Sequence, residues 1–246
     1  MRHNEAVART LGVGEAHVYY RLTEEMDETA LADAVALLSP GEHTRYTRFV
    51  FARDRRDYAA AHALVRTSLS RYAEVTPRAW SFHEEPGGKP SLVADPCAPP
   101  LSFSLSHTHG LVACAVAAGA DVGIDVEQAD RDVDDRVAQR FFSPRERDDL
   151  LGCASDALRA ARFIDLWTLK EAYIKAIGTG LSHPLDTIVF TLDDDRRIAF
   201  APPSDVDAAA WSFRLFSPTE RHRLAVAIRH APNAGASIAL MPGDSV

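Results

Sequence analysis

The sequence predicts an α+β protein with mainly antiparallel sheets. Short segments of alternating apolar and polar residues are typical of strands, and longer segments with apolar residues at helical spacing are typical of helices. The two kinds do not follow each other in the regular strand–helix–strand order that a parallel sheet needs. The chain has 246 residues, of which 46% are hydrophobic and 25% charged, so it can form one large domain or two small ones.

The first half is expected to mix both kinds of element. Residues 18–22 alternate as a strand does, and residues 23–38 have the helical period, with Thr23 as a plausible cap. Residues 52–72 predict a longer helix with a continuous apolar stripe. Glycines and prolines in residues 84–90 and 95–100 predict turns. Three further strands are expected at residues 101–107, 111–118 and 121–127.

The second half is expected to begin with helices and end with strands. The helical segments are residues 137–142, a helix opened by "SPRERDDL", and a long helix through Trp167 that stops near Gly178 and Gly180. Strand patterns return at residues 187–192, 211–216 and 223–228. The tail from Ala231 is small and polar and is expected to be disordered. The sequence shows no evident internal repeat.

Composition and charge exclude several classes of protein. A net charge of -8 argues against a nucleic-acid partner, because phosphate backbones require a basic surface. No apolar run is long enough to cross a membrane. Three cysteines without metal-ligand spacing argue against a disulfide scaffold or a zinc site. With no signal-peptide pattern at the start, we expect a cytoplasmic protein.

Two carboxylates are predicted to share one face of a strand. In "GIDVE", Asp125 and Glu127 lie two residues apart, so their side chains point the same way. Paired carboxylates suit Mg²⁺, which binds oxygen ligands together with phosphate and water. Taken alone, the pair is more often a solvated strand end.

The predicted helix "WTLKEAYIKAIGTG" places charged side chains next to apolar and aromatic ones. Glu171 and Lys175 are four residues apart and therefore share a face with Trp167. A surface ion pair is the simplest interpretation. However, a carboxylate beside buried aromatic rings needs a partner. Glu171 could complete a three-carboxylate cage for a cation, with Lys170 and Lys175 close enough to bind phosphate.

Three other segments could bind anions. "SLSHTHG" places Ser106 and His107 at the end of a strand, although a turn histidine satisfied by the backbone is the more common case. "GGKP" places Lys89 on a glycine-rich turn. Residues 45–56 hold five arginines and one aspartate, which is either a solvated helix face or a binding surface for an anionic ligand or acidic partner.

In this order along the chain, the motifs resemble those of the phosphopantetheinyl transferases of the larger, surfactin-synthetase-activating type. The resemblance covers roughly residues 37–185, and "GIDVE" followed by "WTLKEAYIK" is its most specific part. It implies transfer of the 4′-phosphopantetheine arm of coenzyme A to a serine of an acyl or peptidyl carrier protein, with release of adenosine 3′,5′-bisphosphate. It also implies a pseudo-dimer of two similar α+β halves with coenzyme A between them. We place the halves at residues 1–118 and 119–230 and the tail at residues 231–246.

The resemblance also implies roles for individual residues. Asp125, Glu127 and Glu171 correspond to Mg²⁺ ligands, and Glu171 also to the group that helps deprotonate the carrier serine, directly or through water. Together with Lys175 and Asp125, Glu171 forms the expected catalytic set. The expected coenzyme A contacts are Arg53, Arg56, Lys89, Ser106, His107, Thr108, Asp125, Lys170 and Lys175. Asp57 stands where some relatives carry a basic residue.

The sequence also suggests where a carrier protein could dock, and it leaves two alternative functions open. Carrier proteins are acidic and could dock on the arginine-rich segment that begins at Arg45, or on Arg140, Arg145 and Arg147. The larger type is usually monomeric, so a monomer is expected. A Mg²⁺-dependent phosphohydrolase of nucleotide pyrophosphates would use the same cage with water as nucleophile. A non-catalytic coenzyme A-binding module is expected to have lost some of the acids, yet all three are present.

Overall fold

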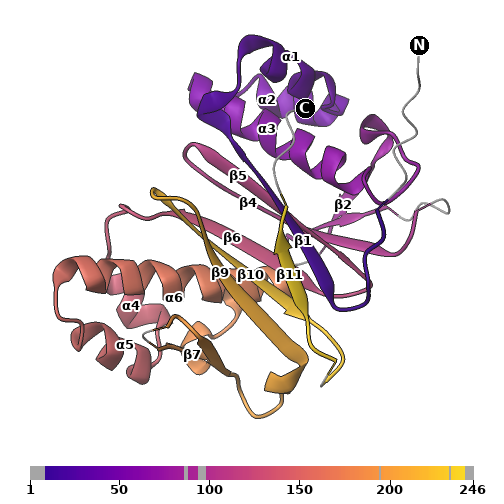
Figure 1. Ribbon diagram of the computed structural model, residues 1–246. Helices are drawn as coiled ribbons and strands as arrows, with labels where there is room; N and C mark the ends of the chain where they lie inside the picture. Colours follow the sequence, from indigo (N-terminus) through magenta and orange to yellow (C-terminus); the bar gives the residue numbers. More distant parts are fainter. Residues whose placement is uncertain (1–8, 86–87, 94–97, 194, 233, 242–246) are drawn as a thin grey trace.

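The computed structural model describes the whole chain except residues 1–8, 86–87, 94–97, 194, 233 and 242–246 (Figure 1). The N-terminal half contains β1 (Glu15–Leu22), α1 (Glu28–Ala36), α2 (Pro40–Tyr46), α3 (Ala52–Leu69), β2 (Phe82–Glu84), β3 (Pro90–Leu92), β4 (Leu101–Thr108) and β5 (Leu111–Ala118). The C-terminal half contains β6 (Val122–Gln128), α4 (Asp135–Phe141), α5 (Pro144–Leu151), α6 (Asp156–Ile177), β7 (Val189–Leu192), β8 (Ile198–Ala201), β9 (Trp211–Thr219), β10 (His222–Arg229) and β11 (Ser237–Leu240). Short 3₁₀ turns connect some of these elements, and no described helix is long and apolar enough to cross a membrane.

The two halves repeat one order of elements. Each half has a strand, two short helices, a long helix, a small hairpin and a long hairpin. In each half the first strand pairs with the last strand of the long hairpin, which gives the sheets β11-β1-β5-β4 and β6-β10-β9. All these pairings are antiparallel except β1 with β11. The expected α+β pseudo-dimer is therefore confirmed.

A sequence signal for this duplication exists but is short. "SPGE" at residues 39–42 and "SPRE" at residues 143–146 each form a capping box at the start of a short helix. The glutamate of each box pairs with a buried cation on the following long helix, Glu42 with Arg66 at 2.9 Å and Glu146 with Lys170 at 2.8 Å. In both halves 24 residues separate the partners. The sequence motif that is repeated in the two halves is therefore a capping box whose glutamate forms a buried structural ion pair.

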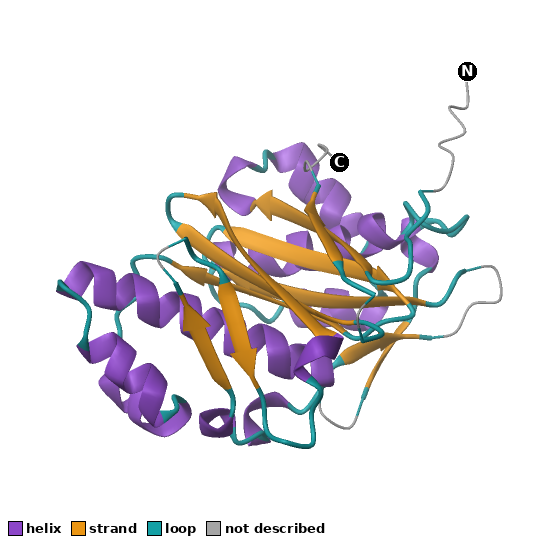
Figure 2. Ribbon diagram, turned by 60° about the horizontal axis from the view of Figure 1, so that its bottom comes forward, coloured by secondary structure: helices purple, strands orange, loops and turns teal. Residues whose placement is uncertain are grey.

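Apolar residues form three layers of core. One layer lies between α3 and the N-terminal sheet, a second between the two sheets, and a third between the C-terminal sheet and α6. Figure 2 shows the strands of both sheets enclosed by helices. The period of two along each strand explains the layers, since alternate residues of β5 and β10 enter different cores. The halves are thus joined through a shared apolar interior.

Serine hydroxyls join the two sheets where β4 lies beside β6. The hydroxyls of Ser104 and Ser106 accept hydrogen bonds from the backbone N–H groups of Ile124 (3.1 Å) and Val126 (3.2 Å). Side chains therefore satisfy N–H groups of β6 that a neighbouring strand would otherwise satisfy. This is why serines alternate with apolar residues in β4. The contact brings the end of β4 next to Asp125.

The structure corrects two expectations for the ends of elements. The expectation of a disordered tail is wrong for residues 237–240, which form β11, and the carbonyl of the buried Ile238 accepts a hydrogen bond from the Arg214 side chain at 2.9 Å. Residues 233 and 242–246 of the tail lie outside the described residues. Thr23 does not cap the first helix. Asp27 does, and the buried Thr23 hydroxyl donates to Asp57 instead. The expected boundary at residues 118 and 119 falls in the turn between β5 and β6.

Candidate active site

A close approach of α6 to β6 builds the centre of the candidate site. Gly123 lies on the face of β6 that also carries Asp125 and Glu127. A Cβ atom at position 123 would stand 2.0 Å from the carbonyl oxygen of Ala172 and 2.4 Å from the nitrogen of Ala176. Only glycine permits this approach. The backbone of α6 therefore packs directly against β6 at Gly123, two residues before Asp125, which is the first carboxylate of the site.

The helix α6 presents Trp167, Glu171 and Lys175 along one face because they are spaced by four residues. Ser155 caps its start, and Gly178, with φ of 73°, ends it in the left-handed conformation. The Lys175 ammonium donates to Asp125 Oδ1 at 2.6 Å, and the Trp167 indole donates to Glu127 Oε1 at 3.0 Å. The structure thus brings together residues that lie 50 and 40 positions apart in the sequence.

The two oxygens of Asp125 have different surroundings. Oδ1 accepts from the hydroxyl of Ser106 at 3.0 Å as well as from Lys175, whereas Oδ2 is buried and has no hydrogen-bond partner among the residues that the structure describes. Burying a carboxylate oxygen without a partner is costly. A cation bound at Oδ2 would remove that cost.

The carboxylates also repel one another. Burial, and after it the charge of Asp125, raises the pKa of Glu171 to about 7, while Lys175 opposes the rise. Burial and Asp125 likewise raise the pKa of Glu127, against the opposing charge of Arg131. Excess negative charge therefore collects where α6 meets β6, so the site favours a cation.

The expected three-carboxylate cage is not assembled in coordination geometry. Among the described residues, no three His, Cys, Asp or Glu side chains are grouped closely enough to hold a metal ion together. Instead, two of the three carboxylates form ion pairs with basic side chains of the protein: Asp125 with Lys175, and Glu127 with Arg131. The three acids are electrostatically coupled, and Asp125, Glu127 and Glu171 as a ligand set stay a prediction.

Lys170 is not at the site. It has no exposed surface and lies on another face of α6, where its ammonium pairs with Glu146 and donates to the carbonyls of Leu185 (2.7 Å) and Ile188 (2.5 Å). The prediction that Lys170 binds phosphate was therefore wrong. Adjacent residues of a helix point about 100° apart, so Lys170 cannot share the face of Glu171.

The strand β4 supplies the N-terminal half of the site. Ser106 is buried and also receives a hydrogen bond from Lys175 at 3.0 Å. His107 is exposed as a residue, but partial desolvation by the surrounding protein lowers the pKa of its imidazole, and the charge of Asp57 opposes this. Thr108 is half-buried at the turn to β5. Both His107 and Thr108 keep their expected role as predictions.

The other expected coenzyme A contacts lie on different elements. Lys89 donates to the carbonyls of Ala176 (2.7 Å) and Val122 (3.3 Å), at the start of β6. Arg53 is exposed at the beginning of α3, over the ring of Phe51, and Arg56 is half-buried one turn later. None of these contacts tests a role in binding coenzyme A.

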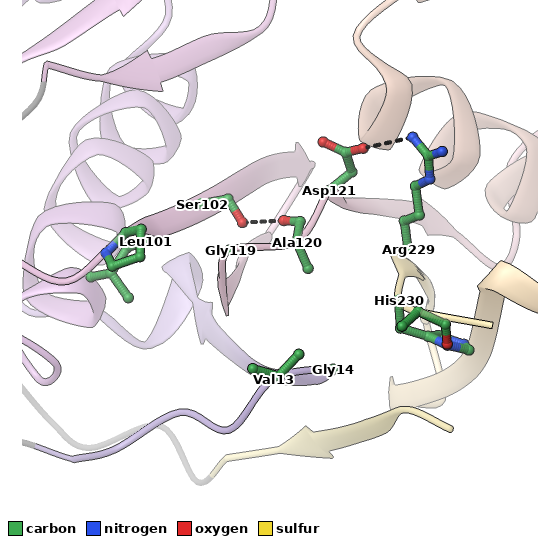
Figure 3. A pocket seen from close by; sticks show the side chains of 11 residues that line it. Val13, Gly14, Leu101, Ser102, Gly119, Ala120, Asp121, Arg229 and His230 are labelled. Atoms are coloured by element: carbon green, nitrogen blue, oxygen red, sulfur yellow. Dashed lines mark hydrogen bonds and ion pairs between the residues drawn. The ribbon is translucent and has the colours of Figure 1, made fainter. Parts of the chain in front are cut away.

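The opposite end of β6 faces a different cavity. Asp121, Arg229 and Ser102 line a cavity of about 500 Å³, and Figure 3 shows how these side chains lie around it. Asp121 and Arg229 are paired at 3.6 Å. The carboxylates Asp125 and Glu127 do not line the cavity. This cavity is therefore separate from the candidate site.

Sequence reasoning missed two residues that shape the site. Gly123 could have been found, because it lies two positions before Asp125 on the same strand face. Arg131, which binds Glu127, lies among aspartates in a loop and gives no signal of its own. Side-chain pairing from such a loop depends on tertiary structure.

Known proteins resemble the chain over nearly its full length. Family models described as the 4′-phosphopantetheinyl transferase superfamily and as 4′-phosphopantetheinyl transferase, N-terminal, match residues 121–227 and 25–119. The 4′-phosphopantetheinyl transferase HetI of Nostoc sp. is 34% identical over 89% of this chain and 90% of its own length. A 4′-phosphopantetheinyl transferase of Bacillus subtilis is 31% identical over 80% of this chain and 84% of its own length.

Among solved structures, holo-[acyl-carrier-protein] synthase of Thermotoga maritima has 24% identity and a TM-score of 0.36, and the match covers 45% of this chain and 62% of that one. The family assignment rests on the sequence relatives and the family models. With two matched halves and relatives of this identity and coverage, the chain belongs to the 4′-phosphopantetheinyl transferase family.

Proposed function

We propose that this protein transfers the 4′-phosphopantetheine arm of coenzyme A to a serine of an acyl or peptidyl carrier protein. Membership of the family supports this activity. The observation that carries it in this chain is the coupled group of Asp125, Glu171 and Lys175 at the junction of the two halves. Such a group provides both a base and positive charge beside one reacting phosphate.

In the proposed reaction, the serine hydroxyl oxygen attacks the phosphorus that carries the pantetheine arm. A new phosphorus–oxygen bond forms, and the bond to adenosine 3′,5′-bisphosphate breaks, so that the leaving phosphate takes the electron pair. Glu171 accepts the proton of the hydroxyl. In the metal-free protein, burial and the charge of Asp125 raise the pKa of Glu171 to about 7, and a bound cation would lower that value. Lys175 stabilises the charge that grows on the leaving phosphate.

Mg²⁺ is the proposed cofactor, held by Asp125, Glu127 and Glu171. Asp125 Oδ2, which has no hydrogen-bond partner among the described residues, and the mutual repulsion of the acids support a cation there, and oxygen ligands suit Mg²⁺. When bound, Mg²⁺ would neutralise charge on the pyrophosphate. Ser106 orients Asp125 through its hydroxyl.

For coenzyme A, we propose that His107 and Lys175 contact the phosphates. The proposed contacts at the nucleotide end are Arg53, Arg56, Lys89 and Thr108. We further propose a cytoplasmic monomer, which agrees with the free thiols of Cys114 and Cys153. Light scattering of the purified protein would measure the oligomeric state, and the mass of a dimer would contradict this.

The activity is tested by incubating the protein with coenzyme A, Mg²⁺ and an apo peptidyl carrier protein, then weighing the carrier by mass spectrometry. We expect the carrier to gain one phosphopantetheine group with the wild type and none with Glu171→Gln. Glu220→Gln is the matched control, because Glu220 is exposed in the turn between β9 and β10. Adenosine bisphosphate released without an acceptor would indicate a hydrolase. Coenzyme A that stays bound and intact would indicate a binding module.

A further inference from the structure

Two side chains from different elements hold the same oxygen of Glu127. The Trp167 indole, on α6, donates to Oε1 at 3.0 Å, and the Arg131 guanidinium, in the loop after β6, donates to the same atom. Arg131 also lies over the Trp167 ring, 5.8 Å from its centroid. Phe141 packs edge-on against that ring at 5.6 Å. The two donors therefore support each other as well as the carboxylate.

The same arrangement occurs at Asp125. Its Oδ1 accepts from Ser106 and Lys175, and within the described part of the chain its Oδ2 has no partner. At both carboxylates, two protein donors hold one oxygen. A carboxylate fixed in this way keeps one rotamer and presents its second oxygen in a constant direction.

Burial makes the arrangement at Glu127 rigid. The Trp167 side chain is 7% exposed and belongs to the core between α6 and the C-terminal sheet. A surface glutamate would move among several rotamers, and binding a cation would have to restrict them. Held by a buried indole and a guanidinium, Glu127 has already lost that freedom.

We propose that Trp167 and Arg131 are positioning residues that fix Glu127 for the cation. This inference rests on the proposed Mg²⁺ site. Neither side chain needs to touch the ion or the substrate. Donors that orient ligating carboxylates typically contribute about 10- to 100-fold in metal affinity.

The test is a titration of the purified protein with Mn²⁺ alone, in which electron paramagnetic resonance measures the free ion. We expect Trp167→Phe, which keeps the ring but removes the N–H, to bind Mn²⁺ about 10- to 100-fold more weakly, and Arg131→Gln to do the same. Because both donors hold one oxygen, the double variant should lose less than the product of the single losses.

Two controls separate this role from general damage. Trp80→Phe removes an indole that donates to Ser70 at 2.9 Å in the N-terminal core, and Arg229→Gln removes an arginine paired with Asp121. Both should bind Mn²⁺ as the wild type does. In transfer assays, Trp167→Phe and Arg131→Gln should need more Mn²⁺ for half-maximal rate but approach the wild-type kcat at saturation.

Three outcomes would overturn the inference. Unchanged Mn²⁺ affinity in both variants would mean that the donors do not position Glu127. Tighter binding by Arg131→Gln would make Arg131 a competitor of the ion. If the wild type binds no Mn²⁺, or if Asp125→Asn binds it equally well, the proposed metal site is wrong and the inference fails with it.

Discussion

Replacing Gly123 by alanine tests whether the contact between α6 and β6 creates the site. The added Cβ would lie 2.0 Å from Ala172 O, 2.4 Å from Ala176 N and 3.0 Å from Ala176 Cα, all backbone atoms that cannot rotate away. Ordinary contacts are about 3.5–4.0 Å, so α6 has to move by more than about 1 Å. Overpacking of this kind costs about 1–3 kcal/mol.

The shift should reduce catalysis more than stability. Moving α6 carries Glu171 and Lys175 away from Asp125, and a misplacement of about 1 Å can cost about 100-fold in rate. For a chain of this size, each kcal/mol lowers the Tm by about 2–4 °C. Calorimetry and the carrier-mass assay would measure both effects on one preparation.

Gly41→Ala is the matched control. Gly41 is exposed in α2, and a Cβ there meets nothing within 4 Å, so alanine should leave activity unchanged and slightly raise stability. If Gly123→Ala kept wild-type Tm and wild-type rate, the close approach would not be what positions the two side chains of α6.

Three other variants test the buried ion pair of Lys170, the raised pKa of Glu171 and the role of Lys175. Lys170→Met leaves the buried charge of Glu146 unpaired and should lower the free energy of unfolding by about 3–5 kcal/mol in urea titrations, and a loss below about 1 kcal/mol would contradict the buried pair. Because folding raises the pKa of Glu171 from 4.5 to about 7, the folded metal-free protein binds the proton more tightly, so this group costs stability as pH rises from about 4.5 through 7. Glu171→Gln should therefore gain stability relative to the wild type between pH 4.5 and 8, and a constant difference in urea unfolding would refute the shift. Lys175→Gln should lower kcat about 100- to 1000-fold with folding retained, and a change in KM alone would assign the lysine to binding.

The sequence predicts the site better than its surroundings. The spacing in "GIDVE" predicts that Asp125 and Glu127 share one face of β6, and the period of α6 predicts that Glu171 and Lys175 share one face of the helix. The tertiary fold then brings these two faces together, through Trp167 with Glu127 and Lys175 with Asp125. Both inferences need only local geometry, because a strand alternates every two residues and a helix face repeats every three or four. Local geometry also explains the error at Lys170, whose position next to Glu171 turns it toward the buried Glu146.

Features that depend on distant contacts could not be predicted in the same way. The strand β11 has four residues and is fixed by pairing with β1, at the other end of the chain. Arg131 contributes to the site only because its loop folds back and brings the guanidinium to Glu127. The duplication is not evident from the sequence, because the clearest similarity between the halves is one four-residue capping motif in each.

Transfer of the phosphopantetheine arm to a carrier protein distinguishes the proposed enzyme from a hydrolase and from a binding module. The most direct test measures adenosine 3′,5′-bisphosphate released and carrier modified in the same reaction with coenzyme A and Mg²⁺. If the protein is a transferase, we expect one bisphosphate released for each carrier that gains the arm, and no release when the carrier serine is replaced by alanine. Continued release with that carrier, or no mass gain on any of several apo carriers, would contradict it.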